Sequence, residues 1–525
     1  MRTAGNLLAA AAAGVLYALV FPPYALSWWA WLALTPLLAL LRNDGGTPRA
    51  LGLGLLFGLG FGVAAGHWMV PSLRLGFGMD GADAVVLALA VMAYSAFWFA
   101  LFAALTVWMR RGRLPELLAV PAAWVACEFG RARLADGLPW LQLGHSQADT
   151  LWILQVAEVA GVPGIAFAIV LVNVLWLRAF AGWWDASADA ASYATRAAAW
   201  AVAVPLAMAG LGAWRVHVLE SETAHRMLRV ALVQAAIPQS ERWVEAFRER
   251  NMERQLELTR QAVADGAELV LWSETSVDLV PEDPAALRRS LAAALGNDPD
   301  RQIAVGLSRR LRPRRGLGDT PPHAYANSVL LVDGSGEERG VYDKIRLFSI
   351  AEQDPTLLLL LPGVARLLAP MLEGTPYLAG TSAAPLETGW CRLGVLICYE
   401  AIYPHLTRET VAQGADVLVN LTNDAFFSTP GAREQHRVQG VFRAVESRRP
   451  LVRVANSGVG TVVLASGRTA LRVEPDEVRA AVIDLAPRSR GTIYLAFGYA
   501  LPGLCIALCA FGLAPRLAPH REGAP

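Results

Sequence analysis

The chain has little charge for its length and almost no lysine. Charged residues make up 17% of its 525 residues, against about a quarter in an ordinary soluble protein, and 54% of the residues are hydrophobic. A composition this apolar indicates that much of the chain lies in a lipid bilayer. The formal net charge is only +1, and the sequence lacks the strong basic run that binding to a phosphate backbone needs. No nucleic-acid partner is therefore expected.

Cysteines are also few, and they are scattered along the chain. Neither CxxC pairs nor interleaved histidines accompany them, so the pattern offers neither a zinc site nor a disulfide framework. Cys391 and Cys398 stand too far apart on one predicted strand for a bridge. Cys505 and Cys509, one helical turn apart, are expected to pack as small apolar side chains. Glycine motifs that bind phosphate are missing. The sequence therefore predicts no metal and no cofactor.

The scarcity of lysine points to one residue. Of the 46 basic residues, only Lys344 is a lysine. A bias toward arginine codons explains the other basic residues but not this exception. Lysine and arginine are not interchangeable where a compact ammonium group is needed beside a reacting atom. Lys344 is therefore a candidate functional residue. The alternative explanation is that a single lysine occurs by chance.

Apolar stretches dominate the first 224 residues and return near the C-terminus. Most approach the roughly 20 residues that cross the apolar core of a bilayer. They lie near 5–21, 27–41, 51–70, 86–108, 116–129, 151–179, 196–214 and 492–513. We predict a membrane domain of about seven spans over 1–224, a water-soluble domain over 225–488, and a final span with a tail over 489–525. A Gly161–Gly164 break is expected within the sixth stretch, and the short fifth stretch is the least secure span.

Arginines give the orientation. With the N-terminus inside, the predicted cytoplasmic ends carry far more arginines than the external loops, as the positive-inside rule requires. This arrangement puts the soluble domain on the outer, periplasmic face of a bacterial inner membrane. A cleaved signal peptide is the alternative for the first stretch and leaves the domain on the same side. If the fifth stretch does not cross the membrane, the soluble domain lies on the cytoplasmic side instead.

The soluble domain alternates apolar strands with helices, which predicts an α/β domain with a large sheet. Strands are expected at 228–237, 267–275, 303–310, 328–334, 392–400, 415–424, 451–458, 461–466 and 480–486. Helical patterns fit 240–265, 284–296, 402–413 and 431–447.

Three polar residues of different chemistry follow strands of this domain, where α/β proteins place reacting groups. Glu274 ends LVLWSE, Lys344 follows VYD, and Cys398 ends LGVLIC. A cysteine thiolate is a nucleophile that a nearby cation stabilises, and a glutamate serves as general base. The ammonium and the backbone N–H of Tyr399 are suited to face an oxyanion. Taken singly, each residue has a structural alternative: Cys398 as a small buried hydrophobic residue, Glu274 as a cap, and Lys344 as a turn residue. Together they predict acyl transfer through a thioester.

The segments LWSET, YDKIRL and LICYE resemble, in this order, the catalytic segments of the nitrilase (carbon–nitrogen hydrolase) superfamily. The flanking apolar stretches, with LADGLPWLQLGHSQ (134–147), TNDAFF (422–427) and RAVESRRPLVRVANSG (443–458), resemble the apolipoprotein N-acyltransferase family over essentially the whole chain. The resemblance implies an α-β-β-α sandwich beside a helical membrane bundle, with a Glu274–Lys344–Cys398 triad.

The resemblance also implies a two-step reaction. Cys398 would take an acyl chain from a phospholipid, typically phosphatidylethanolamine, and pass it to the α-amine of a diacylglyceryl-cysteine at the N-terminus of a lipoprotein. Glu352, Tyr399 and Glu400 match supporting residues of the family, and Trp243 and Phe426 match aromatic residues that contact lipid. The structural alternatives are an arginine pair for Glu400 and core packing for Trp243.

Some positions depart from the family pattern, and other functions remain open. Ser273, Ser349–Ala351 and Phe426–Ser428 replace the usual residues, which leaves loop geometry and lipid choice unsettled. The apolar segment 357–380 is interpreted as a lid that dips into the bilayer, with an ordinary buried loop as its alternative. A membrane-tethered carbon–nitrogen amidase, which transfers to water, is the second functional hypothesis. A transporter is a distant third, because only Glu128 and Glu158 are candidate intramembrane charges.

Overall fold

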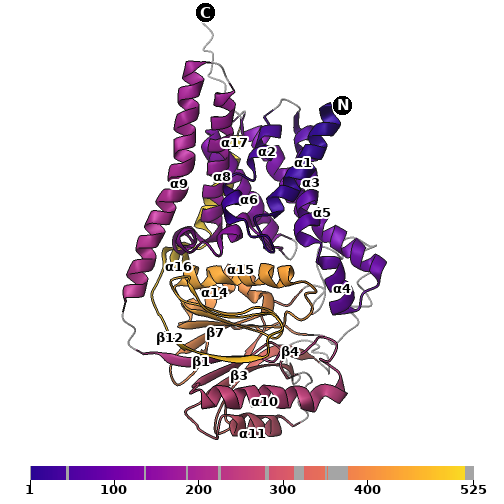
Figure 1. Ribbon diagram of the computed structural model, residues 1–525, viewed down its shortest axis with the longest axis vertical. Coiled ribbons are helices and arrows are strands. Elements are labelled where there is room, and N and C mark those ends of the chain that lie inside the picture. The colour runs from indigo at the N-terminus through magenta and orange to yellow at the C-terminus, as the bar shows by residue number, and fades with distance from the viewer. Residues whose placement is uncertain are drawn as a thin grey trace, which may run out of the picture.

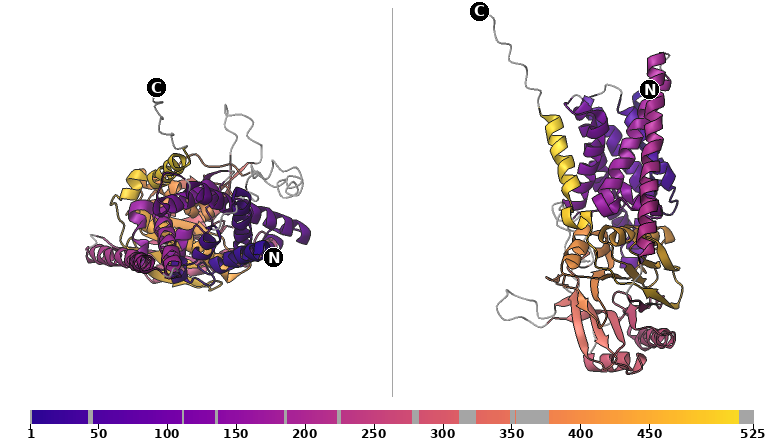
Figure 2. Two further views of the ribbon diagram at one scale, coloured as in Figure 1. Left: turned by 90° about the horizontal axis from the view of Figure 1, so that it is seen from above. Right: turned by 90° about the vertical axis from the view of Figure 1, so that its left-hand side faces the viewer.

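The two parts of the molecule are stacked along its long axis, with a helical bundle at one end and two β-sheets with flanking helices at the other (Figures 1 and 2). The structure is a computed structural model. It describes residues 2–42, 46–110, 112–134, 137–184, 187–222, 226–277, 283–311, 324–348, 352 and 377–514.

Helices from both ends of the sequence form the bundle. They are α1 (Arg2–Ala18), α2 (Thr35–Leu40), α3 (Gly46–Gly66), α4 (Met69–Phe77), α5 (Gly81–Arg110), α6 (Glu116–Arg133), α7 (Leu151–Leu154), α8 (Ala157–Trp183), α9 (Ala188–Ser221), α16 (Ile493–Phe497) and α17 (Ala500–Leu513). Within the described ranges, α3, α5, α8 and α9 are long and apolar enough to cross a membrane. Because α1 and α17 are apolar but shorter, the total number of spans stays a prediction.

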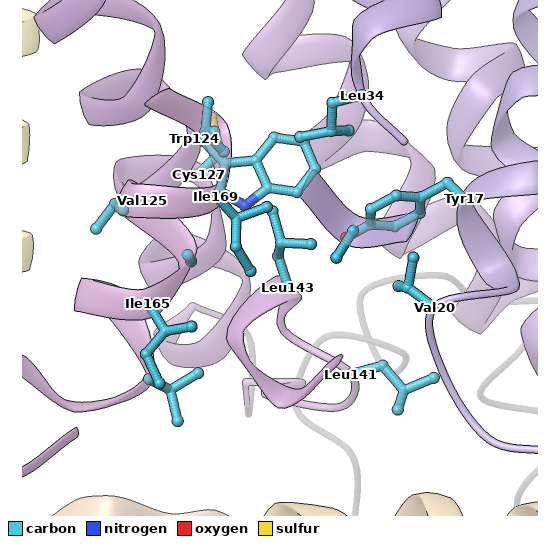
Figure 3. Packing of buried hydrophobic residues seen from close by; sticks show 14 of the residues in the cluster. Tyr17, Val20, Leu34, Trp124, Val125, Cys127, Leu141, Leu143, Ile165 and Ile169 are labelled. Carbon is cyan, nitrogen blue, oxygen red and sulfur yellow. The ribbon is translucent and has the colours of Figure 1, made fainter. Parts of the chain in front are cut away.

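Side chains of the bundle separate into a packed interior and an apolar exterior. Tyr17 and Trp124 lie edge to face with ring centroids 6.0 Å apart, and Leu34, Leu143 and other buried residues surround them (Figure 3). Helix α9 stands at the side of the bundle (Figure 1) and exposes large apolar residues. These include Trp200, Leu206, Leu211 and Trp214. Apolar side chains at this density on an outer face are suited to lipid rather than water.

Two of the predicted apolar stretches are interrupted. The stretch 27–41 divides into a 3₁₀ turn, η1 (Ser27–Trp31), and the short α2. The buried Asn173 of α8 accepts hydrogen bonds from the backbone N–H groups of Leu34 and Thr35, at 2.8 and 3.0 Å, and so satisfies the start of α2. The predicted break in the sixth stretch is confirmed: Gly161 has φ +63°. A Cβ there would also lie 2.5 Å from the Tyr494 ring.

The second part contains two six-stranded sheets. One has the order β12-β1-β2-β3-β4-β5 and the other β11-β10-β9-β8-β7-β6. The strands are β1 (Leu228–Gln234), β2 (Leu269–Trp272), β3 (Gln302–Arg310), β4 (Tyr325–Asp333), β5 (Glu338–Asp343), β6 (Leu386–Glu387), β7 (Arg392–Ile397), β8 (Val417–Thr422), β9 (Leu451–Ala455), β10 (Gly460–Val463), β11 (Thr469–Val473) and β12 (Arg479–Leu485). The β1–β2–β3 and β7–β8–β9 pairings are parallel.

Helices cover the outer face of each sheet. Helices α10 (Arg248–Ala264) and α11 (Pro284–Ala294) lie on the side away from the bundle, whereas α14 (Pro404–Ala412) and α15 (Pro430–Ser447) lie between the second sheet and the bundle (Figure 1). One apolar core joins the two sheets and includes Val230, Leu271 and Val395. The α-β-β-α sandwich beside an apolar helical bundle confirms the predicted fold class. The predicted strands are present, and the short or half-exposed strands β5, β6 and β11 are additional.

Candidate active site

The three predicted residues come together at the ends of their strands. Glu274 lies just after β2, Lys344 directly after β5, and Cys398 directly after β7. Their relative exposures are 6%, 1% and 6%. The Lys344 Nζ lies 3.1 Å from Glu274 Oε1, and Glu274 and Lys344 both act electrostatically on the Cys398 thiol. Sequence reasoning predicted this cluster from three segments that span more than a hundred residues of chain.

A second carboxylate and an amide complete the polar cluster. Lys344 Nζ also lies 2.9 Å from Glu352 Oε2. The Asn327 side chain donates to Glu274 Oε1 at 2.8 Å and to Glu352 Oε1 at 2.7 Å. The backbone N–H of Asn423 donates to Glu274 Oε2 at 2.9 Å. Both oxygens of the Glu274 carboxylate are therefore held in fixed directions.

Opposing effects set the charge states of the ion pair. Burial raises the pKa of Glu274, but Lys344 and the Asn327 amide more than offset this, so the pKa lies below its ordinary value. Burial lowers the pKa of Lys344, yet Glu274 and Glu352 raise it well above its ordinary value. At neutral pH the site therefore holds an ammonium group between two acidic side chains, with Glu274 ionised and ready to accept a proton.

Cys398 stands on a strained turn between β7 and the 3₁₀ helix η4 (Cys398–Ile402). Its φ is +53°, a region that non-glycine residues seldom occupy and that often marks functional sites. The Asn420 side chain fixes this turn by donating to the Cys398 carbonyl at 2.9 Å. Burial and the Glu274 carboxylate raise the pKa of the Cys398 thiol well above its ordinary value, although Lys344 acts in the opposite direction. The sulfur is therefore protonated at rest and needs a base to become a nucleophile.

Glu400 ties the cysteine turn to the lysine segment. Its Oε1 accepts from the backbone N–H groups of Ile345 and Arg346 at 2.7 and 2.9 Å. Its Oε2 accepts from the Ile397 N–H at 2.7 Å and the Tyr342 hydroxyl at 3.0 Å. Burial raises the pKa of Glu400 to about 7 despite these donors. The carboxylate thus binds backbone groups rather than forming the arginine pair that was the structural alternative.

Of the remaining predicted residues, Tyr399 and Phe426 lie beside the polar cluster, and Trp243 lies apart from it. Tyr399 packs edge-on against Phe348 with centroids 5.3 Å apart, and its hydroxyl lies 2.8 Å from that of Tyr403. Phe426 packs on Phe77 at 5.5 Å. Trp243 is 44% exposed, with φ +66°. Phe426 therefore joins the aromatic residues beside the cluster, whereas Trp243 lies on the surface.

A largely apolar cavity of about 270 Å³ opens on Cys398. The sandwich contributes Cys398, Tyr399, Ile402, Phe426, Phe427 and His436, and Phe348 comes from the segment that follows Lys344. The bundle contributes residues of α3, α4 and α5 and the segment around Trp140. The cavity therefore lies between the two parts of the molecule, and its walls are drawn from both.

Sequence reasoning missed Asn327, Asn420, Phe348, Trp140 and the bundle walls of the cavity. Asn327 and Asn420 are polar residues inside apolar strand sequences, and this irregularity is the one signal that pointed to them. Residues 349–351 and 353–376 lie outside the described residues, so the lid interpretation and the changes at Ser349–Ala351 stay predictions. No group of three or more His, Cys, Asp or Glu suited to a metal ion occurs in the part of the chain that the structure describes.

The fold and this site define a class: a membrane-bound enzyme with a carbon–nitrogen hydrolase domain. Residues 229–494 match the carbon–nitrogen hydrolase family, and residues 13–175 match the N-terminal domain of apolipoprotein N-acyltransferase. The apolipoprotein N-acyltransferase of Geobacter metallireducens is 33% identical over 475 residues, which are 88% of this chain and 86% of the relative. That of Gloeobacter violaceus is 30% identical over 98% of this chain and 94% of the relative. The chain therefore belongs to the apolipoprotein N-acyltransferase family.

One solved structure is similar to about half of this chain. An amidase of the nitrilase superfamily from Nesterenkonia has 20% identity and a TM-score of 0.37, over 53% of this chain and 96% of that one.

Proposed function

We propose that this enzyme transfers an acyl chain from a phospholipid to the N-terminal α-amine of a diacylglyceryl-cysteine lipoprotein, through a thioester on Cys398. The observation that carries the proposal is the apolar cavity that opens on the Cys398 side chain and continues between α3, α4 and α5. An amidase that acts on small polar amides has no use for such a space. An acyl chain, by contrast, gains free energy from leaving water for apolar walls.

In the first half-reaction, the Cys398 sulfur attacks the carbonyl carbon of the phospholipid ester while Glu274 takes the thiol proton. The tetrahedral intermediate places negative charge on the former carbonyl oxygen, toward the Lys344 ammonium and the Tyr399 N–H. The carbon–oxygen bond then breaks, and Glu274 returns the proton to the departing alkoxide. The products are a lysophospholipid and the S-acyl enzyme.

In the second half-reaction, the neutral α-amine attacks the thioester carbonyl and Glu274 takes a proton from the nitrogen. The carbon–sulfur bond breaks, and the proton passes from Glu274 to the Cys398 sulfur. Because one carboxyl group takes and returns one proton in each half, the enzyme ends as it began. A thioester carries enough free energy to form an amide, so this scheme needs no nucleotide.

The wider assignment follows from the same substrates. Both lipids lie in the outer leaflet of a bacterial inner membrane, and the arginine distribution favours a periplasmic sandwich. Glu352, held beside Lys344, and Glu400, which ties the cysteine turn to the lysine segment, would position the triad. Phe426 would contact the acyl chain, and Trp243 would contact lipid from the surface.

A mass measurement tests the proposal. Purified protein is incubated with labelled phosphatidylethanolamine, and the intact mass is determined before and after a diacylglyceryl-cysteinyl peptide is added. We expect an acyl adduct on the wild type, none on Cys398→Ala, and discharge of the adduct onto the peptide amine. Cys391→Ala is the matched control, since Cys391 directly precedes β7 and so lies at the end of the strand opposite Cys398, and it should form the adduct normally. An adduct discharged by water alone would support the amidase, and a wild type without an adduct would overturn the thioester.

A further inference from the structure

One wall of the cavity carries a polar atom that the triad mechanism leaves unused. His436 of α15 lines the same cavity as Cys398 and is 1% exposed. Its ring lies against Trp140, with centroids 5.8 Å apart, and meets Phe427 edge-on at 5.7 Å. Its Nε2 is buried and has no hydrogen-bond partner within the described part of the chain. A buried polar atom without a partner carries a free-energy cost that a bound ligand group can remove.

The other ring nitrogen is firmly held. His436 Nδ1 lies 2.9 Å from Asp424 Oδ1. Arg453 donates to the other oxygen of Asp424 at 2.7 Å, and its Nη2 lies 3.1 Å from Nδ1. Thr422 donates to Asp424 Oδ1 at 3.0 Å. These contacts fix the orientation of the ring and leave Nε2 on the side of the ring opposite Asp424.

The charge of Asp424 assigns the proton on the ring. Against the effect of burial, Arg453 and His436 lower the pKa of Asp424, so its ionised carboxylate at 2.9 Å can only accept, and we assign the hydrogen to Nδ1 and the lone pair to Nε2. Burial and Arg453 lower the pKa of His436, although Asp424 and Glu274 act in the opposite direction, which keeps the ring neutral. The His436 ring, which lines the cavity, therefore carries a hydrogen-bond acceptor at a place where the electrostatic effect of Glu274 is also felt.

An acceptor in this position selects among the groups of the proposed substrates. The ester of the acyl donor and the thioester offer oxygen acceptors only, with which a lone pair cannot bond. An amine N–H is a donor. Two amines are available in the proposed reaction: the α-amine of the lipoprotein and the head-group amine of phosphatidylethanolamine. Only the α-amine must reach the carbon bound to Cys398, which lines the same cavity.

We propose that His436 is a substrate-binding residue for the second half-reaction, in which Nε2 accepts a hydrogen bond from the α-amine and directs the nitrogen lone pair toward the thioester. The inference rests on the proposed function. No proton is transferred to His436, because the amine proton lost in the reaction goes to Glu274 as described above. Asp424, Arg453 and Thr422 hold the ring and do not contact the substrate.

Two substitutions separate this role from a structural one. In His436→Asn the amide nitrogen occupies the place of Nδ1, so the bond to Asp424 is kept while Nε2 is lost. In His436→Gln the amide oxygen reaches the place of Nε2, so an acceptor is kept while the bond to Asp424 is weakened. The binding role predicts that Asn is the more harmful change, and a structural role predicts the reverse.

The experiment follows each half-reaction by intact mass. The S-acyl adduct is formed from phosphatidylethanolamine or from phosphatidylglycerol, and a diacylglyceryl-cysteinyl peptide then discharges it. We expect His436→Asn to form the adduct from both lipids within about twofold of the wild-type rate but to lose it to the peptide at least about tenfold more slowly. His436→Gln should recover most of the discharge rate.

Three results would overturn the inference. They are discharge of His436→Asn at the wild-type rate, an equal fall in both half-reactions, and slower adduct formation from phosphatidylethanolamine alone, which would assign the acceptor to the head group. A wild type that forms no adduct is a different failure, because it removes the proposed function itself and this inference with it.

Discussion

Replacing Lys344 by methionine should destabilise the enzyme in a way that depends on pH. The substitution keeps the length of the side chain but leaves Glu274 and Glu352 without the ammonium that lies 3.1 and 2.9 Å from their oxygens. Removing one partner of a buried ion pair costs about 3–5 kcal/mol, because the other charge stays buried without compensation. At about 2–4 °C for each kcal/mol in a domain of this size, the apparent Tm should fall by about 6–20 °C at pH 7.5.

Glu274 supplies the direction of the pH dependence. In the wild type the net pKa of Glu274 is depressed, so its contribution to stability is present above the unfolded pKa of about 4.3 and is lost as the pH falls. Without Lys344, burial and the neighbouring carboxylate raise the pKa of Glu274. Its contribution is then present at low pH and is lost as the pH rises. The difference in Tm between wild type and Lys344→Met should therefore shrink as the pH is lowered from 7.5 to 4.5.

Thermal unfolding in detergent, followed by tryptophan fluorescence across this pH range, measures the effect. Lys344→Arg keeps the positive charge and should lose less stability than Lys344→Met. Because the guanidinium group is larger and planar, this variant should nevertheless form the acyl adduct on Cys398 poorly. Arg260→Met is the matched surface control, since Arg260 pairs with the exposed Glu253 and Glu257 and should change the Tm by no more than about 4 °C. A Tm difference for Lys344→Met that is the same at every pH would refute the reasoning.

Three further substitutions probe the surroundings of the triad. Asn327→Leu removes the amide that donates to Glu274 and Glu352. The rate of adduct formation, measured by intact mass, should fall about tenfold to a hundredfold. An unchanged rate would mean that Lys344 alone orients Glu274. Gly76→Ala places a Cβ 2.7 Å from Phe426 Cβ and 2.9 Å from the Phe426 carbonyl oxygen, so adduct formation should slow at least about tenfold. The control Gly210→Ala has open space around the added Cβ and should match the wild type. Equal rates in the two variants would contradict the close packing of Gly76 against Phe426. Glu400→Gln removes a carboxyl group whose pKa is raised to about 7. The contribution of Glu400 to stability is therefore present below about pH 4.3 and is lost as the pH rises through 7. The Tm, measured from pH 4.5 to 8, should depend less on pH in the variant than in the wild type, and a steeper profile would contradict the raised pKa.

The cluster of Glu274, Lys344 and Cys398 was predictable because the sequence marks each of its members locally. Glu274 and Cys398 each end an apolar run that reads as a buried strand, and Lys344 is the only lysine in the chain. The rule that α/β proteins place reacting groups at strand ends then grouped the three residues, although β2 and β5 belong to one sheet and β7 to the other. The fold class followed from the same alternation of strands and helices, together with the apolar stretches that precede it.

The support around the triad was not predictable in this way, because it depends on contacts between distant segments. Asn327 reaches Glu274 and Glu352 only because β4 pairs with β3 and β5. Glu400 binds backbone N–H groups, which no pattern of side chains reveals. The division of 27–41 depends on Asn173, which lies on α8. Each of these partners is identified by tertiary packing and not by local sequence.

The cavity shows why the hydrolase-like sandwich and the bundle belong to one chain. Its walls come from both parts, so its shape depends on how the two are docked. Gln435 of α15 holds this junction: it accepts from the indole N–H groups of Trp68 and Trp140 at 2.9 and 3.0 Å and donates to the Pro22 and Ala65 carbonyls at 2.9 Å each. Because His436 is the next residue on the same helix, one element holds the bundle walls and also carries the histidine that lines the cavity. Under the proposed function, the depth at which an acyl chain enters the bundle and the approach of the amine to Cys398 are then set by a single helix.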